Sequence, residues 1–393
     1  MKNYDLIIIG SGISGSTFAH LASKTFNNIL ILEKEEILGG CFKTFRHDDF
    51  QIEQGAHTCY NSYTKLLQVF DETNITNKLI PREKVSFKLY YKKSIKKISK
   101  ALSFIDIFKN VINILSTSKE GLTVQEYYST IFGKKNYESL FKYAFGAVLS
   151  QSPDNFPADT LFKKRNFRRK DVVKSFTIRG GLSETIKLIL SNNKIESLTN
   201  TTVSSVTANE SSYIVKTQEQ IFQATHICFA TPANISASLI ENISSKLSIC
   251  LSKIQMATIE SMGIIIDSKK IKIPLITGLI PIDENFYSVV SSDTVKHDNL
   301  RGFTFHFKPE VYDQEQKIEV ISNVLEIKKE DIIKTFESTL KLPILKLGHK
   351  DIISEINQEL KSLKNLYLIG NYFDGLAIED CASRSFTEFN RLK

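Results

Sequence analysis

The strongest constraint on the fold lies at the start of the chain, where a glycine loop joins an apolar run to a helical pattern. The run DLIII leads into Gly10, and Gly10, Gly12 and Gly15 follow the spacing GxGxxG. In this motif the first glycine permits a tight turn, the second lets a pyrophosphate approach the backbone, and the third lets helix and strand pack closely. A second apolar run ends at Glu33, where a carboxylate can accept hydrogen bonds from a ribose. A plain glycine turn would not need this carboxylate, so the sequence predicts a Rossmann-like βαβ unit that binds a dinucleotide.

Composition describes an ordinary globular chain whose positive charge is concentrated in one segment. The 393 residues are 42% hydrophobic and 24% charged, and a chain of this length favours two or three structural units. The formal net charge is +8, and residues 82–174 alone hold 20 Lys and Arg against 8 Asp and Glu. The remainder is therefore mildly acidic, and the basic character belongs to this segment.

The cysteines and the N-terminus favour a reducing environment. The five cysteines are odd in number and scattered, which argues against a disulfide framework and against a metal site: Cys41, Cys59, Cys228, Cys250 and Cys381. The first apolar run ends in a glycine loop rather than a signal cleavage site, and no stretch is long enough to span a bilayer. We therefore expect a cytoplasmic protein without a metal.

Changes of pattern divide the chain into segments. Beyond residue 77 a basic, aromatic stretch is followed by apolar residues at helical spacing, and by Thr123 and Glu126 placed as a capping box. The helical stripe comprises Phe104, Ile107, Phe108, Val111, Ile112 and Leu115. Between residues 254 and 309 several strand-like runs favour an antiparallel sheet. The predicted α/β fold has a Rossmann-like domain made of residues 1–77, 175–240 and 345–393, a basic helical insertion over 78–174, and an antiparallel-sheet substrate domain over 241–344.

Further glycine-marked stretches extend the cofactor motif. EKEEILGG places Gly39 and Gly40 after the acidic strand end, and CFKTFRHDDFQIEQGAH ends in GAH at 55–57. This extension resembles the FAD signature of the superfamily that contains flavin amine oxidases, phytoene desaturases and protoporphyrinogen oxidases. An NAD dehydrogenase would not need it. The resemblance implies FAD as the cofactor.

The resemblance covers nearly the whole chain and is most specific at its end. TVQEYYSTIFGKKNYESLFKYAFGAVLSQSPDN resembles the helical stretch of protoporphyrinogen oxidases, IRGGLSETI their GGMxxL turn, and ATHICFATPAN the strand after their second cofactor contact. LPILKLGHKDIISEI and GNYFDGLAIEDC resemble their tail. In that family the helix after Gly375 points its first amides, near Leu376 and Ala377, at the pyrimidine edge of the flavin, where the helix dipole stabilises negative charge. A tight entry into the last helix would also explain the glycines by itself.

The resemblance implies cofactor contacts from several parts of the chain. They are Gly10, Ser11, Gly12, Ile13, Ser14, Gly15, Glu33, Lys34, Gly39, Gly40, Cys41, Lys43, Gly55, Ala56, His57, Val203, Ala230, Gly370, Asn371, Gly375, Leu376 and Ala377. His57 and Asn371 are the candidates beside the flavin ring, and no residue is assigned as an acid or base. A structural role explains His57 and His349 equally well, and Cys381 is expected to be a small buried side chain.

The sequence also departs from the family. Cys41 stands where the family often has an arginine, so Lys43 becomes the nearer candidate for a phosphate. The chain contains no tryptophan, and the Trp-containing tail and aromatic cage of monoamine oxidases are absent. The chain is also shorter than typical protoporphyrinogen oxidases. These departures bear on the substrate more than on the cofactor.

The basic cluster FKKRNFRRKD at 162–171, together with nearby lysines, has three interpretations. It can be a solvated face, a surface for anionic membrane lipids beside the apolar stripe, or a site for an acidic substrate that uses Lys88, Arg168 and Arg169. A helical hairpin packed on itself explains the apolar stripe without a membrane. Nucleic acid is not expected, because no recognition fold accompanies the charge.

By resemblance, the expected reaction is oxidation of a porphyrinogen, an acidic tetrapyrrole of haem biosynthesis, by hydride transfer to FAD. The alternatives are dehydrogenation of an amine or a polyene, a UDP-galactopyranose mutase-like isomerisation, and a flavin-binding scaffold without turnover. An amine oxidase should have an aromatic cage, and a polyene desaturase a more apolar entrance. The tail GNYFDGLAIEDC does not resemble that of the mutases.

Overall fold

The structure is a computed structural model that describes residues 2–110 and 112–392, and its first part is a Rossmann-like sheet. This seven-stranded sheet has the order β10-β2-β1-β13-β12-β11, and β19 also pairs with β13. The strands are β1 (Lys2–Ile9), β2 (Ile29–Leu32), β10 (Ile195–Leu198), β11 (Val203–Ala208), β12 (Tyr213–Thr217), β13 (Ile221–Phe229) and β19 (Leu366–Leu368). β1, β2, β10, β13 and β19 run parallel, as expected for apolar strands buried on both faces.

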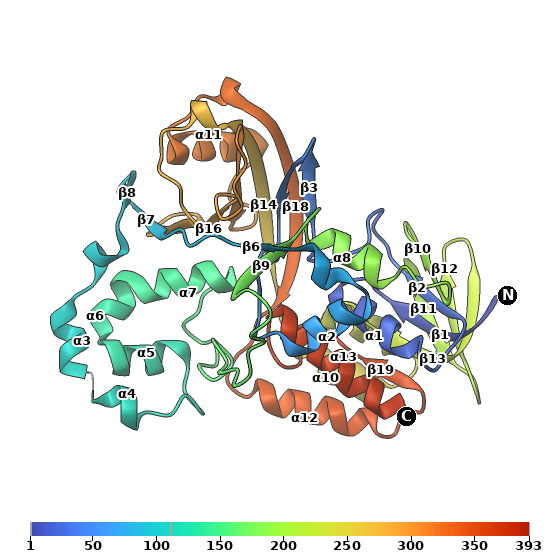
Figure 1. The fold of residues 1–393 in the computed structure, drawn as a ribbon. Helices are drawn as coiled ribbons and strands as arrows, with labels where there is room; N and C mark the ends of the chain where they lie inside the picture. Colours follow the sequence, from blue (N-terminus) through green and yellow to red (C-terminus); the bar gives the residue numbers. More distant parts are fainter. Residues whose placement is uncertain (1, 111, 393) are drawn as a thin grey trace.

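Helices cover both faces of this sheet, at the right of Figure 1. Two buried apolar clusters, one on each face, hold the layers together. One face carries α1 (Ile13–Ala22), α2 (Thr64–Glu72), α8 (Leu182–Ile189) and α13 (Ile378–Leu392). The other carries α9 (Ala233–Ile240), α10 (Ser245–Ser252) and α12 (His349–Leu360). The chain thus returns to its first domain twice.

The second sheet, at the top of Figure 1, is seven-stranded with the order β18-β14-β17-β16-β15-β7-β8. Its strands are β7 (Phe87–Tyr91), β8 (Ser94–Lys96), β14 (Met256–Asp267), β15 (Gly278–Pro281), β16 (Phe286–Ser291), β17 (Leu300–Phe307) and β18 (Ile332–Pro343). α11 (Gln314–Leu325) covers one face over a phenylalanine-rich core. The hairpin of β3 (Thr44–His47) and β4 (Phe50–Glu53) packs on the other face, where Phe45 stacks on Phe336 at 4.1 Å between ring centroids.

A short sheet joins the two parts. It comprises β5 (Cys59–Tyr60), β9 (Ser175–Ile178) and β6 (Leu79–Pro81), in the order β5-β9-β6. β5 and β6 lie on either side of β9, which follows the helical segment in the chain. This sheet therefore fixes where the chain leaves the Rossmann part and where it re-enters it.

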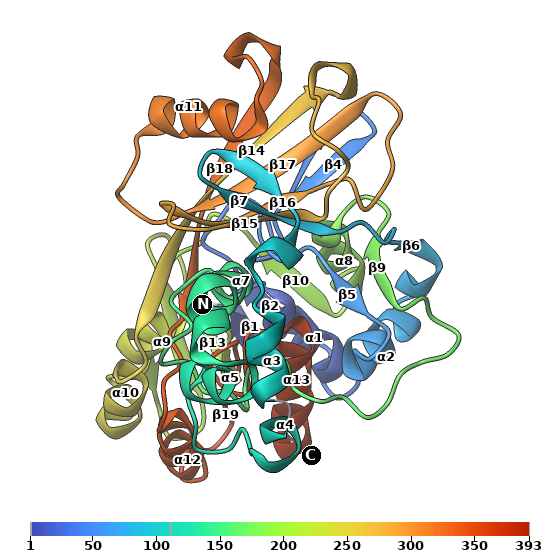
Figure 2. The same ribbon diagram turned by 90° about the vertical axis from the view of Figure 1, so that its left-hand side faces the viewer.

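The helical lobe, residues 98–149, stands apart at the left of Figure 1 and in front in Figure 2. It comprises α3 (Phe104–Asn110), α4 (Asn113–Ser116), α5 (Val124–Phe132), α6 (Lys134–Asn136), a π-helical turn over Tyr137–Phe141 and α7 (Lys142–Leu149), after a 3₁₀ turn at Ile98–Ala101. The predicted capping box is confirmed, since Thr123 and the N3 residue Glu126 bond each other reciprocally at the start of α5. α7 packs on the second sheet beside β15 and β16.

Several predictions about local structure require correction. The basic stretch after residue 77 is not part of a helical segment, because β7 pairs parallel with β15 and β7 pairs with β8. The sequence prediction missed β18, which pairs with β14 along almost its whole length. Lysines and a glutamate interrupt the alternation of apolar residues in this strand. The apolar stripe forms two short helices, α3 and α4, rather than one, and its Val111 lies outside the described residues. The helical hairpin packed on itself is wrong, since Phe108 is 80% exposed and Leu115 is 93% exposed.

Candidate flavin and substrate site

In the glycine loop at the start of α1, two glycines lie in close contact with neighbouring backbone and one faces open space. A Cβ on Gly15 would lie 2.1 Å from the Gly10 carbonyl oxygen, and one on Gly10, whose φ is +103°, would lie 2.7 Å from the Ala230 carbonyl oxygen. A Cβ on Gly12 would meet nothing nearer than the Cα of Gly40 at 3.9 Å. Gly10 and Gly15 are therefore required by the fold itself, whereas Gly12 leaves room where a pyrophosphate would approach.

The same loop presents backbone amides in the geometry that binds phosphate. α1 begins at Ile13, and the first amides of an α-helix, here those of Ile13, Ser14 and Gly15, have no partner within the helix. No acidic residue occupies the first turn of α1, so the positive end of the helix dipole is not neutralised there. Gly39 and Gly40 close the cradle, because the Gly39 amide donates to Ser11 Oγ at 3.1 Å.

Glu33 lies beside this loop at the end of β2, as predicted. Its carboxylate accepts hydrogen bonds from the Ser11 amide at 3.0 Å, the Ser11 hydroxyl at 2.7 Å and the Glu35 amide at 3.1 Å. The Thr201 amide donates to the Glu33 carbonyl at 2.8 Å, which brings the start of β11, and with it Val203, to the same edge of the sheet. Lys34 points to solvent and pairs with Glu35 at 3.1 Å. The carboxylate is thus held ready for a ribose diol, while Lys34 faces away.

The C-terminal turn brings a second helix N-terminus to the cradle. Gly375 has a φ of +142°, and α13 begins at Ile378 directly after Leu376 and Ala377. The Ser385 hydroxyl donates to the Ser14 carbonyl at 2.9 Å, which joins α13 to the start of α1. α13 therefore packs against the start of α1 beside the glycine loop.

The first turn of α13 contains two acidic residues that the sequence analysis did not consider. Glu379 accepts hydrogen bonds from the Thr64 hydroxyl and from the amides of Lys65 and Leu66, so it caps α2 from another helix. Asp380 pairs with Arg165 at 3.0 Å. Both carboxylates are used in tertiary structure, and their position at a helix start stabilises α13.

The segment that ends at His57 runs between the cradle and the second sheet. The Gln54 amide donates to the Lys43 carbonyl at 2.9 Å and the Ala56 amide to the Cys41 carbonyl at 3.2 Å. A Cβ on Gly55 would lie 2.4 Å from the Cys41 carbonyl oxygen, so this position requires glycine. The predicted contacts in 41–43 and 55–57 therefore come together.

His57 is a neutral side chain in this arrangement. Its Nδ1 lies 3.2 Å from the Gly55 carbonyl oxygen, and its own carbonyl accepts a hydrogen bond from the Arg82 guanidinium. Burial, followed by the charge of Arg82, lowers the pKa of His57 to about 4. At neutral pH His57 can therefore donate or accept one hydrogen bond without adding a charge.

A row of four polar side chains crosses the second sheet on the face that meets this segment. In the strand register Ser338 pairs with Ser261, Ser261 with His306, and Ser288 with His306. Ser261 Oγ lies 2.9 Å from His306 Nδ1, and burial, followed by the charge of His57, lowers the pKa of His306 to about 3. Among the described residues the buried hydroxyls of Ser288 and Ser338 have no hydrogen-bond partner.

A hydrogen bond made two residues along β17 from His306 shows where this row lies relative to the segment that ends at His57. Thr304 lies on the same face of β17 as His306, and its hydroxyl donates to the Glu53 carbonyl at 2.9 Å. Unpartnered buried hydroxyls indicate a place where a bound group would complete the hydrogen bonding. Sequence reasoning missed the row, although Ser261 and His306 are polar residues at alternating positions of otherwise apolar strands.

A cleft with a volume of about 340 Å³ opens beside His57. The β3–β4 hairpin, β6, β9 and the loop 291–297 line it, and its charged side chains include Arg46, Arg82 and Arg179. Arg46 pairs with Glu184 at 3.2 Å. Among the described residues Arg82 and Arg179 form no ion pair, and burial lowers the pKa of Arg82. The cleft thus offers two arginines to an anion next to the cofactor segment.

The residues predicted to bind an acidic substrate do not lie in this cleft. Lys88 is in β7 of the second sheet, opposite Leu279 of β15. Arg168 is exposed, and Arg169 forms ion pairs with Asp71 and Asp171 on the surface. The structure does not bring these three residues together. Their assignment to substrate stays a prediction, and Arg82 and Arg179 are better placed.

The remaining candidates take structural positions. His349 Nε2 lies 2.5 Å from the Tyr372 carbonyl oxygen, so this buried histidine fixes the turn that contains Gly370 and Asn371. Cys381 is buried in the Rossmann core, where burial raises the pKa of its thiol to about 12. Among the described residues no cluster of three His, Cys, Asp or Glu side chains could hold a metal ion.

Comparison with known proteins agrees with this geometry. A family described as the NAD(P)-binding Rossmann-like domain matches residues 8–73. The all-trans-retinol 13,14-reductase of Danio rerio is 36% identical over 56 residues, 14% of this chain and 9% of the reductase. A protein of Dictyostelium discoideum assigned as a flavin-containing monoamine oxidase A is 23% identical over 125 residues, 30% of this chain and 27% of the oxidase. These matches cover less than a third of either relative.

Solved structures match the whole chain. A provisionally assigned protoporphyrinogen oxidase from Exiguobacterium sp. 255-15 superposes with a TM-score of 0.82 at 18% identity, over 100% of this chain and 98% of the other. The chain therefore shares the fold of this structure. A fatty acid isomerase from P. acnes superposes with a TM-score of 0.76 at 14% identity, over 99% of this chain and 98% of the other. A putrescine oxidase superposes with a TM-score of 0.71 at 12% identity, over 100% of this chain and 99% of the other.

The dinucleotide that fits this cradle is FAD. The open space at Gly12, the fixed Glu33 carboxylate and the free first amides of α1 suit a ribose and a pyrophosphate. The second helix start at Gly375 and the segment at His57 provide the longer contact surface that a flavin needs beyond a nicotinamide dinucleotide. The predicted fold class is confirmed, and the comparisons agree with the predicted superfamily and with FAD as the predicted cofactor.

Proposed function

We propose that this chain is an FAD-dependent oxidoreductase that dehydrogenates a porphyrinogen. The observation that carries the proposal is the cleft beside His57 with the unpaired guanidinium groups of Arg82 and Arg179. Arginine binds carboxylates through two parallel hydrogen bonds, and a porphyrinogen carries several carboxylates on an apolar ring system. An acidic substrate would be oriented by these arginines.

FAD, when bound, supplies the hydride acceptor, and the chain's residues supply binding, orientation and electrostatics. The amides of α1 would hold the pyrophosphate, and Glu33 the ribose. The start of α13 would offer its first amides to the ring as hydrogen-bond donors, while Glu379 and Asp380 in its first turn offset the positive end of its dipole. The neutral His57 and His306 would add no charge of their own, so the charges that meet the substrate would be those of Arg82 and Arg179 together with the other charged side chains that line the cleft: Arg46, Lys296, Asp48, Asp49 and Glu53.

The similarity to the Exiguobacterium protein supports the fold, and its provisional assignment as a protoporphyrinogen oxidase agrees with the proposed substrate. The absence of tryptophan from the sequence disfavours an amine oxidase cage. The cleft is charged rather than apolar at Arg82 and Arg179, which disfavours a hydrocarbon polyene.

A long-chain carboxylic acid is the second candidate substrate, because the same two arginines would bind its single carboxylate. The fatty acid isomerase from P. acnes shares the fold over 99% of this chain. A porphyrinogen would use both arginines through separate carboxylates, whereas one fatty carboxylate can occupy only one bidentate site.

The test is anaerobic mixing of the purified yellow protein with protoporphyrinogen, coproporphyrinogen or a polyunsaturated fatty acid. Flavin bleaching is expected with at least one porphyrinogen. Porphyrin fluorescence is expected when at least three flavins are present per porphyrinogen, because formation of the porphyrin releases six electrons and each FAD accepts two. Formation of a conjugated diene from the fatty acid, with no porphyrin formed, would replace the proposal by the second candidate. A flavin that stays oxidised with every compound, and no diene, would contradict both.

A further inference from the structure

The outer face of the helical lobe exposes a group of large apolar side chains that do not pack against the rest of the lobe. α3 and α4 contain no buried residue. The exposed fractions are 65% for Phe104, 70% for Ile105, 80% for Phe108, 73% for Ile112, 40% for Ile114 and 93% for Leu115. We call these six side chains the apolar face. Scattered exposed apolar residues are ordinary, but a contiguous group of this kind marks an interaction site.

Polar contacts, rather than apolar packing, hold α3 and α4 on the lobe. Asn136 accepts a hydrogen bond from the Ser103 amide at 2.7 Å and donates to the Ser103 carbonyl at 2.9 Å. The Asn113 side chain donates to the Thr130 carbonyl at 3.1 Å. The inner sides of these helices are therefore secured without the apolar face, which remains turned outward.

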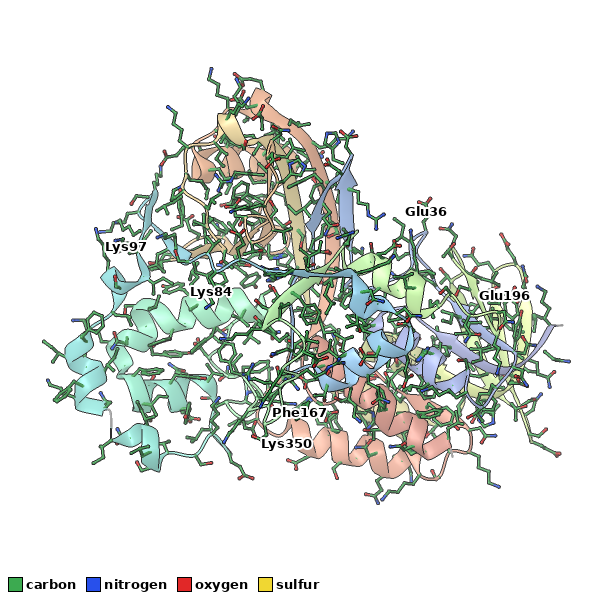
Figure 3. The ribbon with its side chains drawn as sticks, in the orientation of Figure 1. Glu36, Lys84, Lys97, Phe167, Glu196 and Lys350 are labelled. Carbon is green, nitrogen blue, oxygen red and sulfur yellow. The ribbon has the colours of Figure 1, made fainter. Side chains whose placement is uncertain are left out.

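Lysines surround the apolar face. Lys97, Lys100, Lys109, Lys134 and Lys135 are exposed, and none of them forms an ion pair with another described residue. Figure 3 shows Lys97 at the outer edge of the molecule, at the opposite end from Glu196 of the Rossmann sheet. Asp106 is the one acidic residue between Lys97 and Lys119 in the sequence. The apolar face thus has a strongly positive margin.

The charge around the apolar face indicates what covers it. A second copy docked face to face would bring five unpaired lysines against five others, which is repulsive. Apolar side chains with a cationic margin match the boundary between lipid headgroups and acyl chains, where anionic headgroups attract lysines.

We propose that the apolar face and its five lysines dock the protein on an anionic membrane surface. Phe104, Phe108 and Leu115 would enter the acyl boundary, and the lysines would contact anionic headgroups. No helix in the described ranges is long and apolar enough to cross a bilayer, so this contact would be peripheral. α7 belongs to the same lobe and packs on the second sheet, so the substrate side of the molecule would be held close to the lipid.

The test is co-sedimentation of the FAD-loaded protein with phosphatidylcholine vesicles that contain or lack phosphatidylglycerol. Binding is expected only with phosphatidylglycerol, and it should fall as salt rises. The variant Phe104→Ser/Phe108→Ser/Leu115→Ser should lose binding by at least about tenfold. Lys97→Gln/Lys100→Gln/Lys109→Gln should lose about fivefold per lysine removed.

Two controls separate docking from general surface effects. Ile221→Ser/Ile249→Ser removes exposed apolar side chains from β13 and α10, and Lys187→Gln/Lys246→Gln removes lysines from α8 and α10. Both should bind vesicles as the wild type does. Each variant's flavin content reports that it is folded.

Three results would overturn the proposal. The first is that the protein does not bind phosphatidylglycerol vesicles, and the second is that the face variants and the controls bind equally. The third is that the protein forms a dimer in solution and the triple serine variant is monomeric. The last result would reassign the face to contact between copies of the chain.

Discussion

Two helices of this molecule, α13 in the Rossmann part and α3 in the helical lobe, use apolar side chains in opposite ways. α13 buries Ile378, Cys381, Ala382 and Phe389 against α1 and α2, whereas α3 buries none of its residues. Both show helical apolar spacing in the sequence. Spacing thus indicates that a helix has an apolar face, but what that face contacts depends on the tertiary structure around it.

The difference also separates two kinds of function. At the cradle, backbone amides and close glycine contacts dictate the chemistry, so the sequence motif is short and strict. On the lobe, the proposed docking depends on the sum of several exposed side chains, none of which is individually required. We expect substitutions to have large and specific effects at the cradle and small, additive ones on the lobe.

The largest expected effect comes from the glycine loop. Gly12→Val should abolish FAD retention while the protein still folds, because a side chain there meets no protein atom closer than 3.9 Å but occupies the pyrophosphate position. Flavin absorbance after gel filtration and the circular dichroism of the same sample measure the two properties.

Gly15→Ala is the contrasting variant at this loop. Its Cβ would lie 2.1 Å from a backbone oxygen, so folding itself should fail. A Gly12→Val protein that purifies yellow would contradict the cofactor geometry.

The next effect tests burial directly. Phe18 in α1 is 0% exposed, whereas Phe108 in α3 is 80% exposed. Phe18→Ala should lower the free energy of unfolding by about 3–5 kcal/mol, and Phe108→Ala should change it by less than about 0.5 kcal/mol. Urea unfolding measures both. A large loss for Phe108→Ala would show that this side chain is packed in solution.

A smaller effect is expected in the cleft. Arg82→Ala should weaken porphyrinogen binding by roughly tenfold to a hundredfold, because a charge-assisted hydrogen bond contributes about 1.5–3 kcal/mol. Arg168→Ala/Arg169→Ala should change it little, since Arg169 already pairs with Asp71 and Asp171. The concentration dependence of flavin bleaching measures the binding. The reverse order of effects would return the substrate site to the 162–171 cluster.

The smallest effect concerns pH. The pKa of His57 is about 4 and that of His306 about 3 in the folded protein, against about 6.5 in an unfolded chain. Between these values the unfolded chain binds more protons, so the stability from the neutral imidazoles is complete above about pH 6.5 and is lost as pH falls toward 4. His306→Asn should flatten this acid-side loss in urea unfolding, and His47→Asn on the β3–β4 hairpin should leave it unchanged.

The sequence predicted the cradle because its determinants are local. Gly10, Gly12, Gly15 and Glu33 lie within one βαβ unit, where strand, turn and helix follow in order. The C-terminal turn at Gly375 was assigned by resemblance, and the structure shows how Ser385 joins it to Ser14 across the chain. The substrate side depends on contacts between distant strands, which no local pattern contains.

The cleft and the polar row illustrate this limit. Arg82 and Arg179 are far apart in the sequence and become neighbours of one cleft only because β6 pairs with β9. Ser261, Ser288, His306 and Ser338 come from four strands whose register sets the row. The segment after residue 77 was assigned to helix on the apolar spacing between Phe104 and Leu115 and on the capping box at Thr123, whereas pairing with β15 makes its first part a strand.

The most direct test of the account compares coproporphyrinogen with its methyl ester under anaerobic conditions, with the FAD-loaded protein. The ester has the same oxidisable ring but no carboxylates for Arg82 and Arg179. The account predicts that the acid, mixed with at least three equivalents of the FAD-loaded protein to accept its six electrons, bleaches the flavin and yields fluorescent porphyrin. The ester should do so far more slowly at the same concentration. Equal bleaching by both compounds, or by neither, would contradict it.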